Sequence, residues 1–222
     1  FPQTATAEFE PIPVTDETPL GRAIISLRQK GLGIHYGYWL ITGKPKIVLF
    51  ELETLLPEVD AIKGRIWDNH KISTLGVEDL VNQTIVFGEM IRLLLTEVAE
   101  ENKNKTHLVA HFHEWMASTG LPDLKKDKVK IATVFTTHAT MLGRYLAGNV
   151  PNFYDVIENF DWYKEAKHYG IEAQACFERA AAQKADVLTT VSDITAKECQ
   201  YFLGRIPELI LPNDQLLAMV NS

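Results

Sequence analysis

Basic residues are in the minority in this sequence. Its 222 residues include 22 lysines and arginines against 29 aspartates and glutamates, a formal net charge of −7. Proteins that bind a nucleic-acid backbone displace counterions with clustered lysine and arginine, so we expect no nucleic acid among the partners. Long apolar runs are also missing. None approaches the roughly 18 to 20 residues that cross a bilayer, so we expect no membrane partner either.

Cysteine is scarce, and several ligand-binding motifs are absent. Cys176 and Cys199 lie in helix-like segments without CxxC spacing, which is typical of reduced thiols in a cytoplasmic protein. The sequence has neither a GxxxxGK[ST] phosphate loop nor a GxSxG nucleophile turn. Gly31 and Gly33 have the spacing of a dinucleotide motif, but they follow a helix and enter a strand, the reverse of the required order. We therefore predict no cofactor.

What the sequence does contain is an alternation of helix-like and strand-like segments. With 46% hydrophobic residues the chain can bury a large core. Four prolines fall in the first nineteen residues, which predicts irregular structure at 1–19, a loop or an extended edge. Beyond them, apolar spacing and capping residues predict helices at 19–31, 77–100, 114–120, 165–185 and 192–204, and strands at 33–39, 46–52, 106–112, 129–135, 186–191 and 208–213.

This order predicts a doubly wound α/β fold with a mostly parallel sheet. The β-branched runs at 129–135 and 186–191 are typical of strands covered on both faces. Such sheets bind ligands at the carboxyl ends of their strands. The informative residues should therefore lie in "HFHEW", "TTHATMLGR" and "SDIT", the three segments that follow apolar strands. Within the last helix we expect Ser192 or Thr195 as N-cap, a capping box of Thr195 with Glu198, and Gly204 at the end.

His111 and His113 could share a metal ion, because alternate residues of a strand point the same way. A zinc or two-metal site needs further ligands, and no HExxH, CxxC or clustered acidic set supplies them. We predict no metal site, and a metal-dependent hydrolase built on this pair is the alternative. Glu114 follows at the predicted start of a helix, either as a site residue or as compensation for the helix dipole.

His138 lies between a predicted strand and the helix that follows it. Thr136 or Thr137 could cap that helix, and the free N–H groups of its first turn would offer a place for a phosphate or another anion. A histidine there can donate or accept a hydrogen bond near neutral pH. Arg144 could reach the same anion or pair with a surface acid.

Taken in order, five segments resemble one family. They are "VAHFHEWMASTGLP", "IATVFTTHATMLGRYLAG", "NFYDVIENFDWYKEA", "CFERAAAQKADVLTTVSDITAKE" and "LILPN". With "KGLGIHYGYWLITGKPKIVLFEL" and "GRIWD" before them, they are similar to the amino-terminal domain of the eukaryotic-type glycogen synthases, glycosyltransferase family 3. The similarity covers about residues 17 to 213.

This resemblance implies the amino-terminal Rossmann-like half of a GT-B type retaining glucosyltransferase. Its substrates would be UDP-glucose and the non-reducing end of an α-1,4-glucan. By motif, His138 would lie beside the transferred sugar, Glu114 in the sugar and acceptor region, and Arg144 near the cleft. His113, Thr137 and Asn213 would also contribute to substrate binding. The departing phosphate is thought to help deprotonate the acceptor, so His138 and Glu114 would position and stabilise rather than attack.

The resemblance also predicts an incomplete domain over 1–222. The glycine-rich loop of the family would lie upstream of Phe1, and a carboxyl-terminal domain would follow, so we expect this piece to be inactive alone. The start at "FPQTATAEFEPIP", without an initiator methionine, also suggests a segment of a longer protein. "PND" stands at 212–214 where the family has "PNG". A homo-oligomer is compatible with the sequence, and a non-catalytic glucan-binding module is a third hypothesis.

Overall fold

A computed structural model describes residues 8–102 and 106–211. Its amino-terminal part is an antiparallel sheet with the strand order β1 (Phe9–Pro11), β2 (Gly33–Trp39) and β3 (Lys46–Glu51). Helix α1 (Pro19–Gln29) packs against it. The sequence predicts irregular structure at 1–19. Residues 1–7 lie outside the described part, and β1 forms a three-residue edge strand after them.

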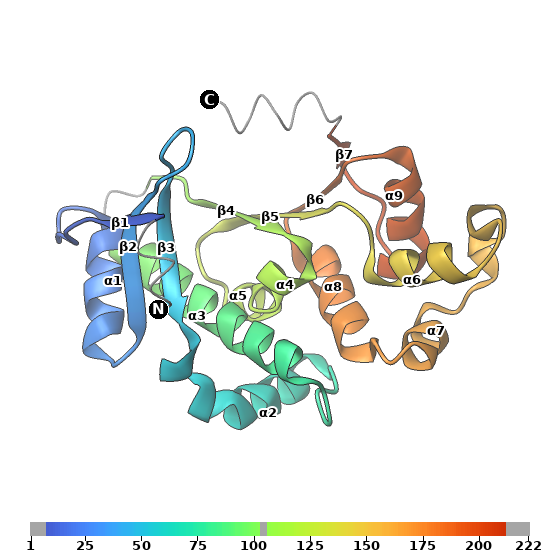
Figure 1. Cartoon of the computed structure of the whole chain (residues 1–222), viewed down its shortest axis with the longest axis horizontal. Coiled ribbons are helices and arrows are strands. Elements are labelled where there is room, and N and C mark those ends of the chain that lie inside the picture. Colours follow the sequence, from blue (N-terminus) through green and yellow to red (C-terminus); the bar gives the residue numbers. More distant parts are fainter. Residues whose placement is uncertain (1–7, 103–105, 212–222) are drawn as a thin grey trace.

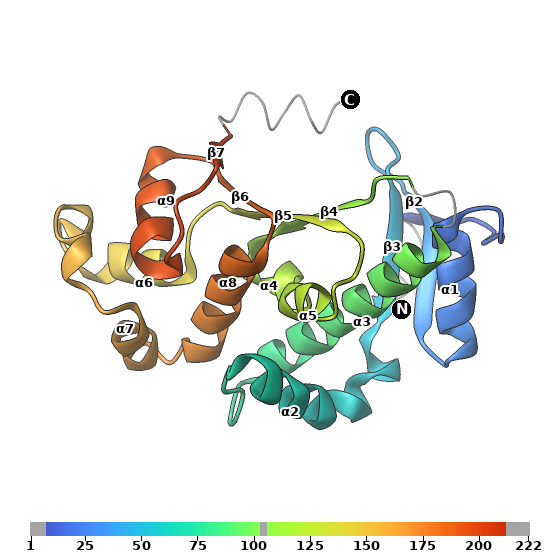
Figure 2. The same ribbon diagram turned by 180° about the vertical axis from the view of Figure 1, so that it is seen from behind.

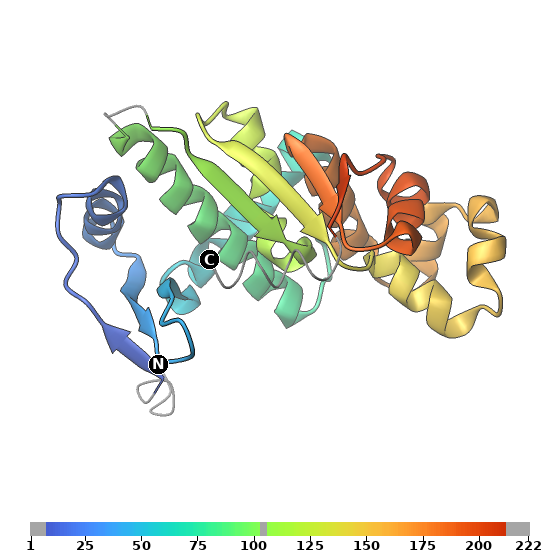
Figure 3. The same cartoon turned by 90° about the horizontal axis from the view of Figure 1, so that it is seen from above.

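The central sheet is parallel, with the strand order β4 (Val109–His113), β5 (Ala132–Thr137), β6 (Val187–Thr190) and β7 (Leu209–Ile210). Helices connect its strands, which confirms the predicted α/β class. The described strands follow one another across the sheet without a reversal of order (Figure 3). Because the strands are parallel, the carboxyl ends of β4, β5 and β6 meet at one edge.

Long and short helices lie together on the same side of this sheet, as Figures 1 and 2 show from opposite directions. They are α3 (Asp79–Glu101), α4 (Glu114–Ser118), α5 (Leu121–Lys126) and α8 (Glu172–Lys184). Phe112, Phe135 and Leu188 point from three strands into the core between this layer and the sheet. None of the helices in the described ranges is long and apolar enough to cross a membrane.

The opposite face of the sheet is only partly covered in the described residues. Val109 is 64% exposed and Val187 is 36% exposed. The expectation that 129–135 and 186–191 are covered on both faces is confirmed only in part, because Thr189 on this face is 3% exposed whereas Ala132 and Val187 are exposed. Their β-branched residues suit the pleated backbone of a strand whether or not a second layer covers them.

The remaining elements frame the carboxyl edge of the sheet or lie beneath it. They are α2 (Val59–His70), α6 (Met141–Asn149), α7 (Trp162–His168), α9 (Asp193–Glu198), a π-helical turn η6 (Cys199–Leu203), and short 3₁₀ turns η2 (Leu52–Thr54), η3 (Leu56–Glu58), η4 (Phe153–Asp155) and η5 (Ile157–Asn159). The sequence analysis missed α2 and α5. It also predicted one helix at 165–185, whereas Gly170, with φ +70°, ends α7 and lets α8 begin in a new direction.

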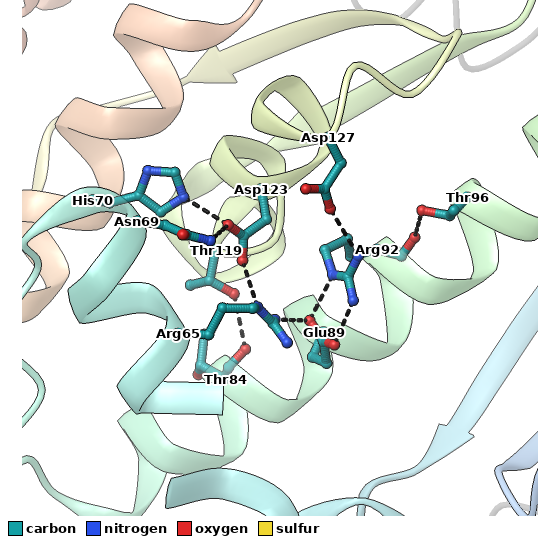
Figure 4. A network of polar contacts seen from close by, with 10 residues as sticks. All are labelled: Arg65, Asn69, His70, Thr84, Glu89, Arg92, Thr96, Thr119, Asp123 and Asp127. Atoms are coloured by element: carbon teal, nitrogen blue, oxygen red, sulfur yellow. Dashed lines mark hydrogen bonds and ion pairs between the residues drawn. The ribbon is translucent and has the colours of Figure 1, made fainter. Parts of the chain in front are cut away.

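A buried polar network joins α2, α3 and α5 beneath the sheet (Figure 4). The Asp123 carboxylate, which is 4% exposed, accepts hydrogen bonds from Arg65 at 3.0 Å, Asn69 at 2.8 Å and His70 at 2.8 Å. Burial opposes its charge, but these three bonds outweigh that effect and hold the pKa of Asp123 well below its usual range. The network therefore stabilises the helices that support the sheet only while Asp123 is ionised.

Asp123→Ala should lower the free energy of unfolding by about 2 to 4 kcal/mol, because it removes the partner of His70, whose side chain is 6% exposed, and one acceptor each of Arg65 and Asn69. Since the folded pKa is depressed, the stabilisation is present above the ordinary pKa of aspartate and is lost as the pH falls toward the folded pKa. Urea unfolding of both proteins at pH 7 and at pH 3 measures this. The difference between them should shrink at pH 3.

Asp127→Ala is the matched control. Asp127 pairs with Arg92 at 3.2 Å, but its side chain is 49% exposed, so its removal should cost less than about 0.5 kcal/mol. Equal effects of the two substitutions would contradict a special role for the Asp123 network.

Candidate active site at the carboxyl edge of the sheet

Glu114 begins α4 at the end of β4 with φ +62°, a left-handed conformation that glutamate rarely adopts. Such a backbone costs on the order of 1 kcal/mol or more. The turn directs the carboxylate toward the neighbouring strand β5, where Oε1 accepts a hydrogen bond from the His138 amide at 3.0 Å. The same oxygen lies 3.6 Å from Nη2 of Arg144 on α6.

His138 lies in the loop between β5 and α6, and elements on both sides hold its backbone. Glu114 binds its amide, and the Thr195 hydroxyl of α9 donates to its carbonyl at 3.1 Å. The side chain of His138 is exposed. All three segments that the sequence singled out, "HFHEW", "TTHATMLGR" and "SDIT", thus meet around this residue, which confirms that they share one edge.

Three imidazoles line this edge. Nδ1 of His113 lies 3.4 Å from Nε2 of His138, and the rings of His111 and His113 are 4.2 Å apart. Partial burial lowers the pKa of both His111 and His113, and the neighbouring imidazoles lower it further. Both rings are therefore neutral near pH 7, so each offers one donor and one acceptor nitrogen.

The paired histidines do not extend into a metal site. His111 instead makes a 2.6 Å hydrogen bond to the hydroxyl of Thr136. In the described ranges, no three or more His, Cys, Asp and Glu residues are grouped so that they could hold a metal ion. The alternative of a metal-dependent hydrolase built on His111 and His113 gains no support, because the further ligands that it needs are missing from this part of the chain.

Thr137 has a different place from the one predicted. It is fully buried, and its hydroxyl donates to Glu178 at 3.1 Å, so its side chain supports the loop and does not face a ligand. Neither Thr136 nor Thr137 caps α6. Thr140 is the N-cap, and its hydroxyl accepts from the Gly143 amide.

The predicted anion site at the start of α6 is also wrong, because protein carboxylates already take its amides. Glu178 accepts from the Met141 amide at 2.9 Å, and Glu198 accepts from the Thr140 amide at 3.0 Å. The expected capping box of Thr195 with Glu198 does not form either, because Glu198 bonds to Thr140 instead. Ser192 caps α9 alone, while the carboxylate of Glu198 turns away to Thr140. Gly204, with φ +68°, ends this helical segment as predicted.

Glu178 and Glu198 are the residues that the sequence analysis missed at this edge. Both are nearly inaccessible, with exposures of 1% and 2%. A signal was available for Glu178, since it shares the buried face of α8 with Ala181 and Ala182. A charged residue on the apolar face of a helix is rare unless it is hydrogen-bonded.

The other predicted site residues differ in how the structure places them. Arg144 lies at the edge, close to Glu114, with its side chain 54% exposed. His113 lies beside His138. Asn213 is outside the described residues, so its predicted contribution stays a prediction.

Glu178 should impose a pH dependence on stability. Burial raises its pKa to about 8, and the nearby carboxylates of Glu114 and Glu198 add to the shift. Between the ordinary pKa of glutamate and about pH 8, the folded state then holds a proton that the unfolded state has lost. Stability should fall as the pH rises through this window, by on the order of 1 kcal/mol per pH unit, and should level off above it.

Urea unfolding between pH 5 and pH 9 tests this, with Glu178→Gln as the reference because its amide does not titrate. The difference in unfolding free energy between wild type and variant should change across the window. A difference that is constant over the whole range would show that Glu178 keeps an ordinary pKa.

The chain is similar in sequence to known proteins over almost its whole length. The glycogen synthase family model matches residues 1–220. A glycogen [starch] synthase from Neurospora crassa is 40% identical over 211 residues, which are 95% of this chain and 30% of that protein. Isoform 1 of the enzyme from Saccharomyces cerevisiae is 39% identical over 219 residues, covering 95% of this chain and 31% of its own length. The liver glycogen [starch] synthase of Mus musculus is 40% identical over 192 residues, covering 86% and 27%.

The chain thus spans less than a third of the length of these relatives. The family model nevertheless covers almost every residue of it, including the segments that build the edge around Glu114 and His138. This agreement over the whole chain shows that it belongs to the glycogen synthase family.

Proposed function

We propose that the protein containing this chain is a retaining glucosyltransferase. It transfers glucose from UDP-glucose to the 4-hydroxyl at the non-reducing end of an α-1,4-glucan. Membership of the glycogen synthase family supports this activity. The observation that links this activity to particular residues is the cluster of Glu114, His138 and Arg144 at the carboxyl edge of the parallel sheet.

In this proposal His138 contacts the transferred sugar. Its side chain is exposed at the edge while its backbone is held at both the amide and the carbonyl. A fixed backbone with an exposed imidazole suits a group that must meet a sugar in one orientation. The neutral ring of His113 beside it can set which nitrogen of His138 carries the proton.

Glu114 orients and stabilises in this scheme and is not a covalent nucleophile. Its Oε1 already accepts from the His138 amide and faces the guanidinium of Arg144. In this proposal Arg144, half exposed beside Glu114, balances negative charge on the donor phosphates as the bond to the sugar breaks. The departing phosphate then takes the acceptor proton, so no protein base is needed on the opposite face.

We also propose which domain residues 1–222 form, in which compartment the protein acts and how it assembles. We assign residues 1–222 to the amino-terminal Rossmann-like half of a GT-B enzyme, whose other half completes the cleft. The free thiols of Cys176 and Cys199 support a cytoplasmic location. A homo-oligomer is compatible with this scheme, and sedimentation of the full-length protein measures the assembly directly.

His138→Ala and Glu114→Ala in the full-length protein should each lower kcat by about 10²- to 10³-fold, because each removes a group that orients or stabilises the transition state. The measurement is incorporation of radiolabelled glucose from UDP-glucose into glycogen. Glu114→Gln should retain part of the activity, since its amide oxygen can still accept from the His138 amide.

His107→Ala is the matched control, because His107 is exposed and lies before the amino end of β4, away from this edge. It should leave kcat unchanged. Glycogen binding by a protein without transferase activity would favour the non-catalytic module instead. Wild-type turnover in His138→Ala and Glu114→Ala would remove these residues from the reaction.

A further inference from the structure

The loop that presents His138 spans only residues 138–140, between the last residue of β5 and the first residue of α6. Two buried glutamate side chains hold it from below. Glu178 reaches it from α8, and Glu198 reaches it from α9. Neither residue contacts the exposed edge, and the scheme above gives neither a role.

Glu178 clamps the two ends of the loop together. Its Oε1 accepts from the Thr137 hydroxyl at 3.1 Å, and its Oε2 accepts from the Met141 amide at 2.9 Å. These two partners lie on either side of residues 138–140. A single rigid side chain therefore sets the distance between the end of β5 and the start of α6.

Glu198 holds the same loop from α9. Its Oε2 accepts from both the amide and the hydroxyl of Thr140, at 3.0 and 2.9 Å, and its Oε1 accepts from the Tyr154 hydroxyl at 2.9 Å. The first turn of α6 lies directly against this carboxylate. A Cβ at Gly143 would overlap it, so only glycine allows the helix to approach so closely.

We propose that Glu178 and Glu198 are positioning residues for His138, which fix the loop in the geometry that glucosyl transfer requires. The effect on glucosyl transfer rests on the proposed function, whereas the fixing of the loop rests on the hydrogen bonds alone. Burying two carboxyl groups costs folding free energy. What the pair adds is a fixed backbone on both sides of His138.

A neutral carboxyl group suits the clamp that Glu178 forms. Burial raises its pKa to about 8, so the group is mostly protonated near pH 7. A glutamine at this position keeps the shape, and its amide oxygen can accept from the Met141 amide while its nitrogen donates to the Thr137 hydroxyl. Glu178→Gln should therefore restore the function that Glu178→Ala removes.

The first experiment compares Glu178→Ala, Glu178→Gln and Glu89→Ala in the full-length protein. Glu89 is the matched control, a 6% exposed glutamate whose partners are Arg65 and Arg92, away from the loop. Glu178→Ala should lower kcat about 10- to 100-fold, the effect of a misplaced catalytic group, with a smaller change in KM for UDP-glucose. Glu178→Gln should stay within about threefold of wild type.

Glu89→Ala should lower the melting temperature without lowering kcat per folded molecule. Equal losses of kcat in Glu89→Ala and Glu178→Ala would show that Glu178 only stabilises the fold, and would overturn the proposal. Gly143→Ala gives an independent check, because it displaces the Glu198 carboxylate without touching Glu198 itself. It should lower kcat in the same way.

A double-mutant cycle tests whether the carboxylates act through His138. Glu178→Ala should have almost no further effect on kcat in the His138→Ala background, because the group being positioned is already gone. Fully additive losses would overturn the proposal while leaving glucosyl transfer intact.

Hydrogen exchange separates this inference from the proposed function. In Glu178→Ala, and not in Glu89→Ala, amides in a peptide covering residues 136–146 should exchange at least about tenfold faster, since Met141 loses its acceptor. Unchanged exchange would overturn the positioning role. If instead the wild-type protein transfers no glucose, the proposed function fails, and the exchange result still decides whether the carboxylates hold the loop.

Discussion

The hydrogen bond from the His138 amide to the Glu114 carboxylate depends on the parallel pairing of β4 with β5. In that register His113 lies opposite Thr136, so β4 and β5 end at the same edge, where Glu114 follows β4 and His138 follows Thr137, the last residue of β5. The two partners are 24 positions apart in sequence, and the pairing of β4 with β5 brings them together. A shift of β4 by one residue would send Glu114 to the other face of the sheet and break the contact.

Several costs are concentrated at this edge. Glu114 adopts a left-handed backbone, and the carboxyl groups of Glu178 and Glu198 are both buried beneath the same loop. The amino terminus of α6 offsets part of the second cost, since its partial positive charge favours the carboxyl groups of Glu178 and Glu198 beneath it. The apolar layer beneath the sheet and the Asp123 network supply stability elsewhere. The edge can therefore keep a geometry that local preference would not choose.

The sequence predicted much of this arrangement because most of the information is local. Alternation of periodicity placed the parallel strands, and turn residues such as Gly204 placed helix ends. It failed where a distant partner decided the outcome. The hydroxyl of Thr195 donates to His138 while Ser192 caps its helix, Glu198 accepts from Thr140 in place of the expected capping box, and the hydroxyl of Thr137 donates to Glu178. No periodicity reports such contacts, which lie 41 to 58 residues apart in sequence.

A motif can therefore match a family while its residues have two different physical duties. In "TTHAT", the exposed imidazole of His138 faces outward, whereas the hydroxyls of Thr137 and Thr140 face the carboxylates beneath. The resemblance assigns both His138 and Thr137 to one site, but burial and hydrogen bonding separate the exposed side chain from the buried hydroxyl. The hydroxyl of Thr137 is bonded to a buried carboxyl group beneath the loop, whereas the side chain of His138 is exposed at the edge.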